Sequence, residues 1–362
     1  MQLRFLRLLL AGLTGVAMTT LALQVACRVD VFPPGSMLSG LGYLPASWWI
    51  PVVLPLAVGS WALRQRGPSV ALVAAFLVLL ALAGDFSLTR RPSPPADSQR
   101  KLSVLALNVR GYLSGRAEVV RALTDSGADV ALLSENVLTA EEAEQLRKEV
   151  FPAQFRMGRS GETAILSRRP ILDFKEVNLP SHQLSLTGPN SLEERDKGPP
   201  RSFVHAVVDA DGLPVHVISV RLIAGRPPAS DPWNELRWAS YLLRAQADEF
   251  AFFENYLRRL KGPFIFGGDL NATPPSFGVR RLSALAVDSY LALHSFGRPT
   301  FRVSAPVMRI DYLFASPELV PVMADRLDVV VSHHFPVYAE YRIPPGRIRG
   351  PSSPTTAGPS LP

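Results

Sequence analysis

The stretch Gly267-Gly268-Asp269-Leu270-Asn271-Ala272-Thr273-Pro274 follows the apolar residues 264–266, and this combination predicts a buried strand that ends in a polar turn. Loops that follow strands are common positions for catalytic groups. Asp269 and Asn271 are two residues apart, so on an extended backbone their side chains project to the same side. Together they could hold one small target, and a phosphate with its metal ion would fit. The alternative is an Asx turn before Pro274, which would make both residues structural.

Other polar side chains follow apolar runs elsewhere in the chain. Residues 103–108 predict a strand that ends in Asn108, and residues 130–134 predict a strand that is followed by Glu135. Taken singly, an amide at a strand end is usually a turn former, and a solitary Glu or His is usually structural. Nearer the carboxyl end come two more segments, Arg309-Ile310-Asp311-Tyr312 and Ser332-His333-His334-Phe335-Pro336-Val337.

These segments, in this order, resemble the endonuclease/exonuclease/phosphatase superfamily, the divalent-metal phosphodiesterases that include DNase I-like nucleases, inositol polyphosphate phosphatases and neutral sphingomyelinases. The resemblance covers roughly residues 102–343. It implies an α/β (α+β) fold, a four-layer sandwich of two packed sheets flanked by helices. It also implies an enzyme, a phosphoric ester hydrolase that uses Mg²⁺ or Mn²⁺. Glu135 and Asn108 would hold the ion, since Mg²⁺ binds through one or two carboxylates plus water and substrate oxygens.

The resemblance implies roles for the other polar residues as well. Asp269 would activate or orient the attacking water, and Asn271 would contact the phosphate. His334 would contact the phosphate and stabilise the charge of the transition state, with Asp311 orienting it. A carboxylate next to an imidazole favours the protonated ring, which would offer positive charge to a phosphoryl group.

The sequence departs from the superfamily pattern at two positions. The residue before the final His is usually Asp, and here it is His333, which would shift metal preference or weaken metal binding. In residues 217–222, Arg221 stands where the phosphate-facing His of the family is expected. Arginine binds phosphate with two hydrogen bonds and stays charged. We therefore expect Arg221 to contact the substrate phosphate, and the role of His333 stays open.

Residues 102–343 alternate between strand and helix patterns, which is typical of a layered α/β domain. Residues 116–126 and 235–260 have the pattern of helices. The turn at residues 211–212 predicts a hairpin between the strands on either side of it. Residues 181–200 resemble an irregular surface loop. Further strands are expected at residues 164–167, 203–208, 215–220, 264–269, 312–314 and 329–331.

The amino-terminal part contains three apolar runs, residues 8–26, 41–63 and 70–86. A helix needs about 20 such residues to cross a bilayer, so we expect about three transmembrane helices. Tryptophans near the ends of the second run suit the membrane interface. The first run could instead be a cleaved signal peptide. Its length and the two runs after it favour a retained anchor.

Positive charges near the runs predict the orientation. Arg4 and Arg7 precede the first run, and Arg64 and Arg66 lie between the second and third runs. Both clusters of basic residues should face the cytoplasm. With three spans, the rest of the chain would lie outside the cytoplasm, although the basic residues 90–91 argue against this. We thus expect a multi-pass membrane protein with an extracytoplasmic catalytic domain.

We divide the chain into a membrane region (1–89), a Pro- and Ser-rich linker (90–101), a catalytic domain (102–343) and a disordered tail (344–362). The net charge is +7, and the first 100 residues hold eight Lys and Arg against three Asp and Glu. The catalytic domain thus lacks the basic bias of a dedicated nuclease. The single cysteine, Cys27, excludes an intramolecular disulfide and zinc sites built from several thiolates.

The function that these patterns favour is a membrane-anchored, metal-dependent phosphodiesterase, in which water attacks a phosphate ester. The expected partners are the membrane and a phosphate-ester substrate, either a lipid headgroup or nucleic acid, and no protein partner is predicted. One alternative is an extracytoplasmic nuclease. The other is a catalytically silent module that binds a phosphate or a partner, and metal-dependent turnover would reject it.

Overall fold

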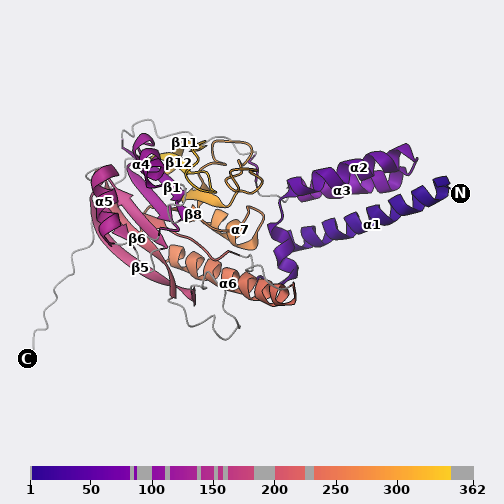
Figure 1. Ribbon diagram of the computed structural model, residues 1–362, viewed down its shortest axis with the longest axis horizontal. Coiled ribbons are helices and arrows are strands. Elements are labelled where there is room, and N and C mark those ends of the chain that lie inside the picture. Colours follow the sequence, from indigo (N-terminus) through magenta and orange to yellow (C-terminus); the bar gives the residue numbers. More distant parts are fainter. Residues whose placement is uncertain are drawn as a thin grey trace, which may run out of the picture.

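The computed structural model shows a layered α/β domain from which three amino-terminal helices project (Figure 1). The expected tail lies outside the described residues, and so does the expected linker apart from residues 100–101. The structure describes residues 2–81, 85–87, 100–110, 115–136, 140–150, 154–157, 162–182, 200–224 and 232–343.

Two mixed sheets pack face to face. The first has the strand order β11-β12-β1-β2-β4-β3, and the second has the order β5-β6-β7-β8-β10-β9. The strands are β1 (Lys101–Asn108), β2 (Val130–Ser134), β3 (Gln154–Met157), β4 (Thr163–Ser167), β5 (Ile171–His182), β6 (Pro200–Ala210), β7 (Leu213–Ser219), β8 (Phe264–Asp269), β9 (Val287–Asp288), β10 (Asp311–Ala315), β11 (Val320–Arg326) and β12 (Val337–Arg342).

Helices cover the outer face of each sheet. In β1, Val104 and Ala106 point into the core between the sheets, whereas Leu105 and Leu107 point toward the covering helices. Because both faces are covered, the strand is apolar throughout instead of alternating. The expected arrangement of two packed sheets flanked by helices is therefore confirmed. The helices are α4 (Arg116–Asp125) and α5 (Ala140–Val150) on the first sheet, and α6 (Pro232–Arg258) and α7 (Phe277–Ser283) on the second.

Strand pairing brings the polar strand ends to one edge of the sandwich. β1 and β2 are parallel with Asn108 opposite Ser134, so Asn108 and Glu135 leave the first sheet together. β8 is antiparallel to β10, with Asp269 opposite Asp311. We call this end of the two sheets the polar edge.

Gly268 allows β7 and β8 to approach closely at the polar edge. Its φ is +131°, and a Cβ atom there would lie 2.2 Å from the carbonyl oxygen of Val220. Glycine is the residue that tolerates both this backbone conformation and this contact. The glycine thereby permits Arg221, in the loop after β7, to lie beside Asp269.

Most of the expected elements are present, and the expected hairpin forms because β6 and β7 pair across residues 211–212. The strand expected at residues 329–331 is wrong, since these residues belong to the loop that connects β11 to β12. Val329 and Val330 are exposed there. The loop expected at residues 181–200 is shorter, because Ser181 still belongs to β5 and β6 already begins at Pro200; residues 183–199 lie outside the described part.

The amino-terminal part does not contain the three full-length transmembrane helices expected from the sequence. Within the described residues, only α1 is long and apolar enough to cross a membrane, and α2 and α3 are apolar helices of 13 and 16 residues. Two residues of the second and third runs lie outside these helices: Tyr43 packs against the core of the second sheet, and Phe86 pairs with Phe296. The elements are α1 (Gln2–Arg28), the 3-10 helices Leu38–Tyr43 and Ala46–Trp49, α2 (Ile50–Ala62) and α3 (Arg66–Ala81).

The three helices pack on one another through a small apolar cluster. At the end far from the α/β domain, Gln65 donates a hydrogen bond to the carbonyl of Arg7. At the near end, the Arg28 guanidinium donates to the carbonyl of Leu79. We call these the distal and proximal ends of the bundle. The outside of the bundle is apolar, with exposed side chains that include Leu9, Leu13, Val16, Leu54, Val58, Trp61, Val70 and Leu77.

A buried histidine in the second sheet predicts how stability depends on pH. His205 lies 2.8 Å from His216 and contacts the Tyr256 hydroxyl, and burial, aided by His216 and Lys175, lowers its pKa to about 3. The unfolded chain, with a His pKa near 6.5, binds the extra proton between pH 6.5 and 3. Stability should therefore fall with pH in this window, by up to about 1.4 kcal/mol per pH unit.

Replacing His205 by Gln should flatten this dependence. The measurement is the apparent Tm of the full chain in detergent between pH 7.5 and 4.5, for both proteins. Equal losses of Tm would show that another group is responsible for the acid sensitivity.

Candidate active site

Asn108 links three of the expected site residues at the polar edge. Its Nδ2 donates to Glu135 Oε1 (3.3 Å) and to Asp269 Oδ2 (3.1 Å). The same nitrogen lies 3.5 Å from His334 Nε2. Its Oδ1 accepts a hydrogen bond from the backbone amide of Arg110 (2.9 Å). Asn108 is buried, so these bonds fix the spacing of the carboxylates around it.

His334 is held by Asp311 from the opposite side. The Nδ1 atom of His334 lies 2.9 Å and 3.1 Å from the two carboxylate oxygens of Asp311. Asp311 is itself oriented by Thr300, whose hydroxyl donates to Oδ2 (2.7 Å) and accepts from the Asp311 amide (3.1 Å). The Nε2 atom of His334 is thus directed toward Asn108 and Asp269, as the sequence predicted for a histidine oriented by Asp311.

Arg221 lies among acidic side chains. Its Nη2 donates to Glu135 Oε1 (2.9 Å) and its Nη1 to Glu162 Oε1 (3.1 Å). Its Nε lies 4.0 Å from Asp269 Oδ2 and has no hydrogen-bond partner among the described residues. A buried donor without a partner is costly, so an oxygen of a bound ligand would be stabilised at this position.

The charges at the site shift its pKa values in opposite directions. Burial raises the pKa of Asp269 to about 6, Asp311 adds to the effect, and His334 and Arg221 oppose it. Burial alone would lower the pKa of His334, but the carboxylates of Asp311, Asp269 and Glu135 outweigh it and raise that pKa to about 9. A proton acceptor and a protonated donor therefore lie side by side at neutral pH, which is a feature of active sites.

The turn after Asp269 differs from the extended backbone expected. Asn271 has φ of +50°, and its backbone amide donates to Asp269 Oδ1 (2.9 Å), which forms the Asx turn considered as the alternative. The Asn271 side chain donates to the carbonyl of Leu222 (2.8 Å). The turn leaves Asp269 Oδ2 facing Asn108, so it orients the carboxylate instead of excluding a site. Contact of Asn271 with phosphate stays a prediction.

His333 lies at the rim of the site. It is exposed, and burial of part of the ring together with Arg110 and Arg302 lowers its pKa. The exposed ring of His333 is not part of the buried group formed by Asp269, Asp311 and His334. Its replacement of the Asp usual in the family therefore leaves that buried group intact.

Two residues that help to build the site were not predicted. Glu162 pairs with Arg221, and it comes next to Glu135 because Thr163 of β4 is opposite Ser134 of β2. Thr300 holds Asp311 from a segment with no distinctive motif. The register of β2 with β4 could have identified Glu162, but the sequence alone does not specify that register.

The donor groups at the polar edge fit a hard divalent cation. One atom from each of Asp269, Asp311 and His334 lies within 4.8 Å of the others, and because His334 is protonated at neutral pH the oxygens of the two carboxylates are the groups able to bind a cation. Glu135 is partly exposed, and the two bonds made to it by Asn108 and Arg221 both end on Oε1. Carboxylate oxygens of this kind, with water and substrate oxygens, are the ligands that Mg²⁺ and Mn²⁺ prefer.

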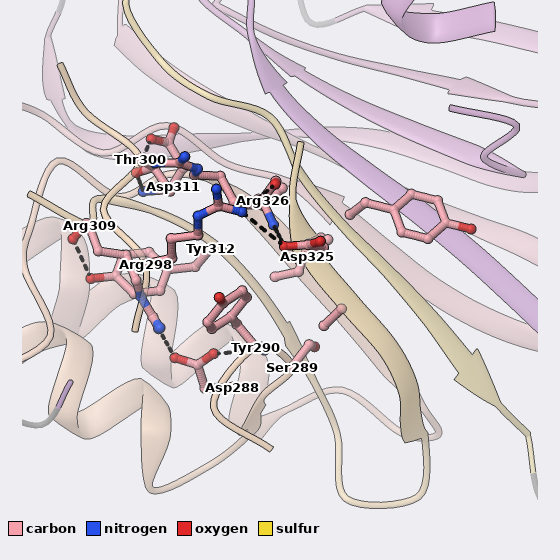
Figure 2. Close-up of a pocket in the computed structure, with 14 residues that line it drawn as sticks. Asp288, Ser289, Tyr290, Arg298, Thr300, Arg309, Asp311, Tyr312, Asp325 and Arg326 are labelled. Atoms are coloured by element: carbon pink, nitrogen blue, oxygen red, sulfur yellow. Dashed lines mark hydrogen bonds and ion pairs between the residues drawn. The ribbon is translucent and has the colours of Figure 1, made fainter. Parts of the chain in front are cut away.

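A small cavity is lined in part by Asp311 and Thr300 (Figure 2). Its volume of about 20 Å³ has room for about one water molecule. Arg309 forms an ion pair with Asp288 at this cavity. The cavity is too small for a phosphate ester.

Comparison with known proteins agrees with this arrangement. Residues 105–335 match the model of the Endonuclease/Exonuclease/phosphatase family. No curated protein matches the chain. Among solved structures, a humanized D. rerio TDP2 carrying 14 mutations has 18% identity and a TM-score of 0.50, covering 67% of this chain and 99% of that one. This similarity shows the fold.

Two further structures are similar at slightly lower scores. An endonuclease/exonuclease/phosphatase from Beutenbergia cavernae DSM 12333 has 20% identity and a TM-score of 0.49, covering 68% of this chain and 72% of that one. D. rerio TDP2 in complex with a single-strand DNA product has 18% identity and a TM-score of 0.49, with coverages of 67% and 99%. From the family match over most of the α/β domain, we conclude that the chain belongs to the endonuclease/exonuclease/phosphatase family.

Proposed function

We propose that this protein is a membrane-anchored, divalent-metal-dependent phosphodiesterase. The observation that carries the proposal is the hydrogen-bonded group at the polar edge, in which Asn108 joins Glu135, Asp269 and His334. These side chains come from four distant parts of the sequence, and a structural role alone would not require a buried Asp269 with a raised pKa.

The residues have distinct roles in the proposed reaction. A Mg²⁺ or Mn²⁺ ion held by Glu135, with Asn108 beside it, would polarise the phosphoryl oxygen when bound. Asp269 accepts a proton from the attacking water, whose oxygen forms the new bond to phosphorus as the bond to the leaving oxygen breaks. His334, protonated through its contact with Asp311, and Arg221 donate hydrogen bonds to the phosphoryl oxygens, where negative charge accumulates.

Membrane anchoring is supported by the amino-terminal bundle. Its outer surface is apolar, and α1 has the length and composition of a spanning helix. The bond between Gln65 and Arg7 joins the distal ends of the helices, so the basic residues in the first turns of α1 and at the junction of α2 with α3 gather at one end. By the positive-inside rule the distal end faces the cytoplasm, and the catalytic domain lies on the other side.

An extracytoplasmic nuclease is the second candidate, because a related structure holds a DNA product. A nuclease of this kind should bind duplex or single-stranded DNA with strong salt dependence. The near-balanced charge of the catalytic domain favours the first proposal. The third possibility, a silent binding module, predicts no turnover at all.

Metal dependence is the direct test of the proposed function. Hydrolysis of bis(p-nitrophenyl) phosphate by the full chain in detergent should require added Mg²⁺ or Mn²⁺ and stop on chelation. Glu135→Gln should raise the metal concentration for half-maximal activity by about tenfold or more, since a metal carboxylate is lost. Glu144→Gln, on the exposed face of α5, is the control and should change nothing. Activity that survives chelation would overturn the proposed function.

A further inference from the structure

We propose that the polar edge faces the bilayer that holds α1, and that the substrate is the phosphate ester of a lipid headgroup in that same membrane. The inference rests on the proposed function and adds the class and location of its substrate. It is drawn from contacts between the proximal end of the bundle and the loops that surround the site.

The segment after α1 contacts the loop that follows Asp269. The Thr273 hydroxyl donates to the carbonyl of Tyr43 (2.6 Å). Arg280, in α7, bonds to the carbonyl of Arg28 and forms an ion pair with Asp30. Thr273 is four positions after Asp269, so their Cα atoms are at most about 14 Å apart. The site therefore lies within a short distance of the last residues of α1.

The segment after α3 makes a second connection. Gly297 donates its amide to the carbonyl of Asp85 (2.9 Å), and Phe86 pairs with Phe296 across an isolated β-bridge. The carboxylate of Asp85 lies 3.5 Å from Arg309, two residues before Asp311. Both chain segments that leave the bundle thus contact loops of the polar edge. Figure 1 shows α7 and the end of β8 on the side of the domain from which the helices project.

These contacts fix the catalytic domain relative to the bundle. A domain tethered by a flexible linker alone could turn its site toward any direction. Here two separate connections, through Tyr43 and through Asp85, hold the domain with the loops of the polar edge next to the proximal end of the bundle. If α1 spans the bilayer, these loops lie at the membrane surface.

The rim of the site carries exposed apolar side chains. Val330 is 58% exposed and Val329 is 42% exposed, in the loop that leads to His334. Val307 is 44% exposed in the neighbouring turn, where Val303 donates its amide to the carbonyl of His333. Exposed apolar side chains around a cleft mark a surface that meets another apolar phase or partner.

The rim is continuous with the proximal end of the bundle. Phe296 is 74% exposed and follows the contact made by Phe86. Arg298 forms an ion pair with Asp328, directly before Val329. These contacts connect Asp85 and Phe86, which come after α3, with the loop beside His334. A bilayer surface would cover Phe296 and the valines together.

Charge at the rim suits lipid phosphates. Arg110 donates its backbone amide to Asn108 Oδ1, and Arg302 lies between Phe301, which pairs with His334 in an isolated bridge, and Val303, which donates its amide to the carbonyl of His333. Two arginines beside apolar side chains match the interface of a bilayer, where phosphate groups lie above the acyl chains. A soluble ester would gain nothing from exposed valines, and a nucleic acid would require a longer basic surface. The lipid headgroup is therefore the occupant that these observations favour.

The test compares two esters with the same leaving group. The full chain is reconstituted in phosphatidylcholine vesicles that contain dioleoylglycerol phospho-p-nitrophenol, and p-nitrophenolate release is followed. In a second arrangement the chromogenic lipid is supplied in separate vesicles, and in a third the substrate is soluble bis(p-nitrophenyl) phosphate. Water supplies the oxygen that replaces the nitrophenolate in every case. Hydrolysis in the shared membrane should be at least tenfold faster than hydrolysis in separate vesicles.

The outcomes separate this inference from the proposed function. Turnover of the soluble ester without preference for the shared membrane would overturn the inference and leave the phosphodiesterase proposal intact. No turnover of any ester would overturn the proposed function itself. Equal rates for lipid in shared and separate vesicles would show that the site does not face its own bilayer.

Substitutions at the rim give an independent test. The double change Val329→Ser with Val330→Ser should lower hydrolysis of the lipid in the shared membrane about tenfold and leave the rate with the soluble ester within about twofold. Leu172→Ser is the matched control, because Leu172 is 57% exposed at the start of β5, next to the opposite end of the sheet. A rim variant that behaves like the control would contradict the proposed contact with the membrane.

Discussion

Asp269→Asn is expected to lower kcat/KM by roughly 10³-fold while the protein remains folded and gains a few degrees in Tm. The loss follows from the role of the carboxylate as proton acceptor, since general bases typically contribute 10²- to 10⁴-fold. Asparagine has nearly the same shape, so its Oδ1 can still accept the bond from the Asn271 amide, while its Nδ2 would replace the acceptor of the Asn108 bond at a cost of about 1 kcal/mol. The lost function is therefore the charge and its basicity.

The gain in Tm follows from the pKa of Asp269. Burial raises this pKa to about 6, above the unfolded value near 3.8. The folded protein thus binds the extra proton more readily, which contributes stability below pH 3.8 that is lost as the pH rises through 6. At neutral pH the buried carboxylate destabilises the fold, and replacing it with a neutral amide removes this cost. Such a trade of stability for activity is typical of active sites.

The measurement pairs steady-state hydrolysis of bis(p-nitrophenyl) phosphate with thermal unfolding of the same samples. Asp209→Asn is the control, because Asp209 also accepts a backbone hydrogen bond in a turn, from Gly212, and lies at the opposite end of the sheets. Asp209→Asn should cause neither the loss of activity nor the gain in Tm that is expected for Asp269→Asn. If Asp269→Asn keeps full activity, Asp269 has no part in the mechanism.

Asn108, Glu135 and Asp269 were predictable because each lies at or directly after the end of an apolar strand. Runs such as 130–134 specify a buried strand by composition, and the polar residue that follows must leave the core. The approach of Asn108 to Glu135 then follows from the parallel pairing of neighbouring strands. The expectation that Asp311 orients His334 came from the family resemblance. The distance of 2.9 Å between Asp311 Oδ2 and His334 Nδ1 agrees with it.

Contacts between distant segments could not be predicted. Glu162 reaches Arg221 only through the register of β2 with β4, which composition does not fix. The length of the apolar runs was misleading in the amino-terminal part. Tyr43 packs against the core of the α/β domain and Phe86 pairs with Phe296, and hydropathy does not distinguish such contacts from contact with lipid.

Arg221→Gln is expected to affect substrate and metal in opposite directions. The guanidinium is the donor for which we propose contact with the substrate phosphate, so its loss should lower kcat/KM by roughly 10²- to 10³-fold. The same guanidinium bonds to Glu135 Oε1 at 2.9 Å and competes with a cation for that oxygen. Removing it should therefore tighten metal binding by about tenfold, measured as the Mn²⁺ concentration for half-maximal activity or by calorimetry.

Arg221→Lys separates charge from geometry in this prediction. Lysine keeps the positive charge near Glu135 but cannot donate to Glu135, Glu162 and a phosphoryl oxygen from one planar group. Metal binding should then stay close to that of the unchanged protein, while kcat/KM falls by an intermediate factor. If Arg221→Gln weakened metal binding instead, the guanidinium would be supporting the metal site, for example by keeping Glu135 in position. The sign of the change in metal affinity thus decides whether Arg221 serves the substrate or the ion.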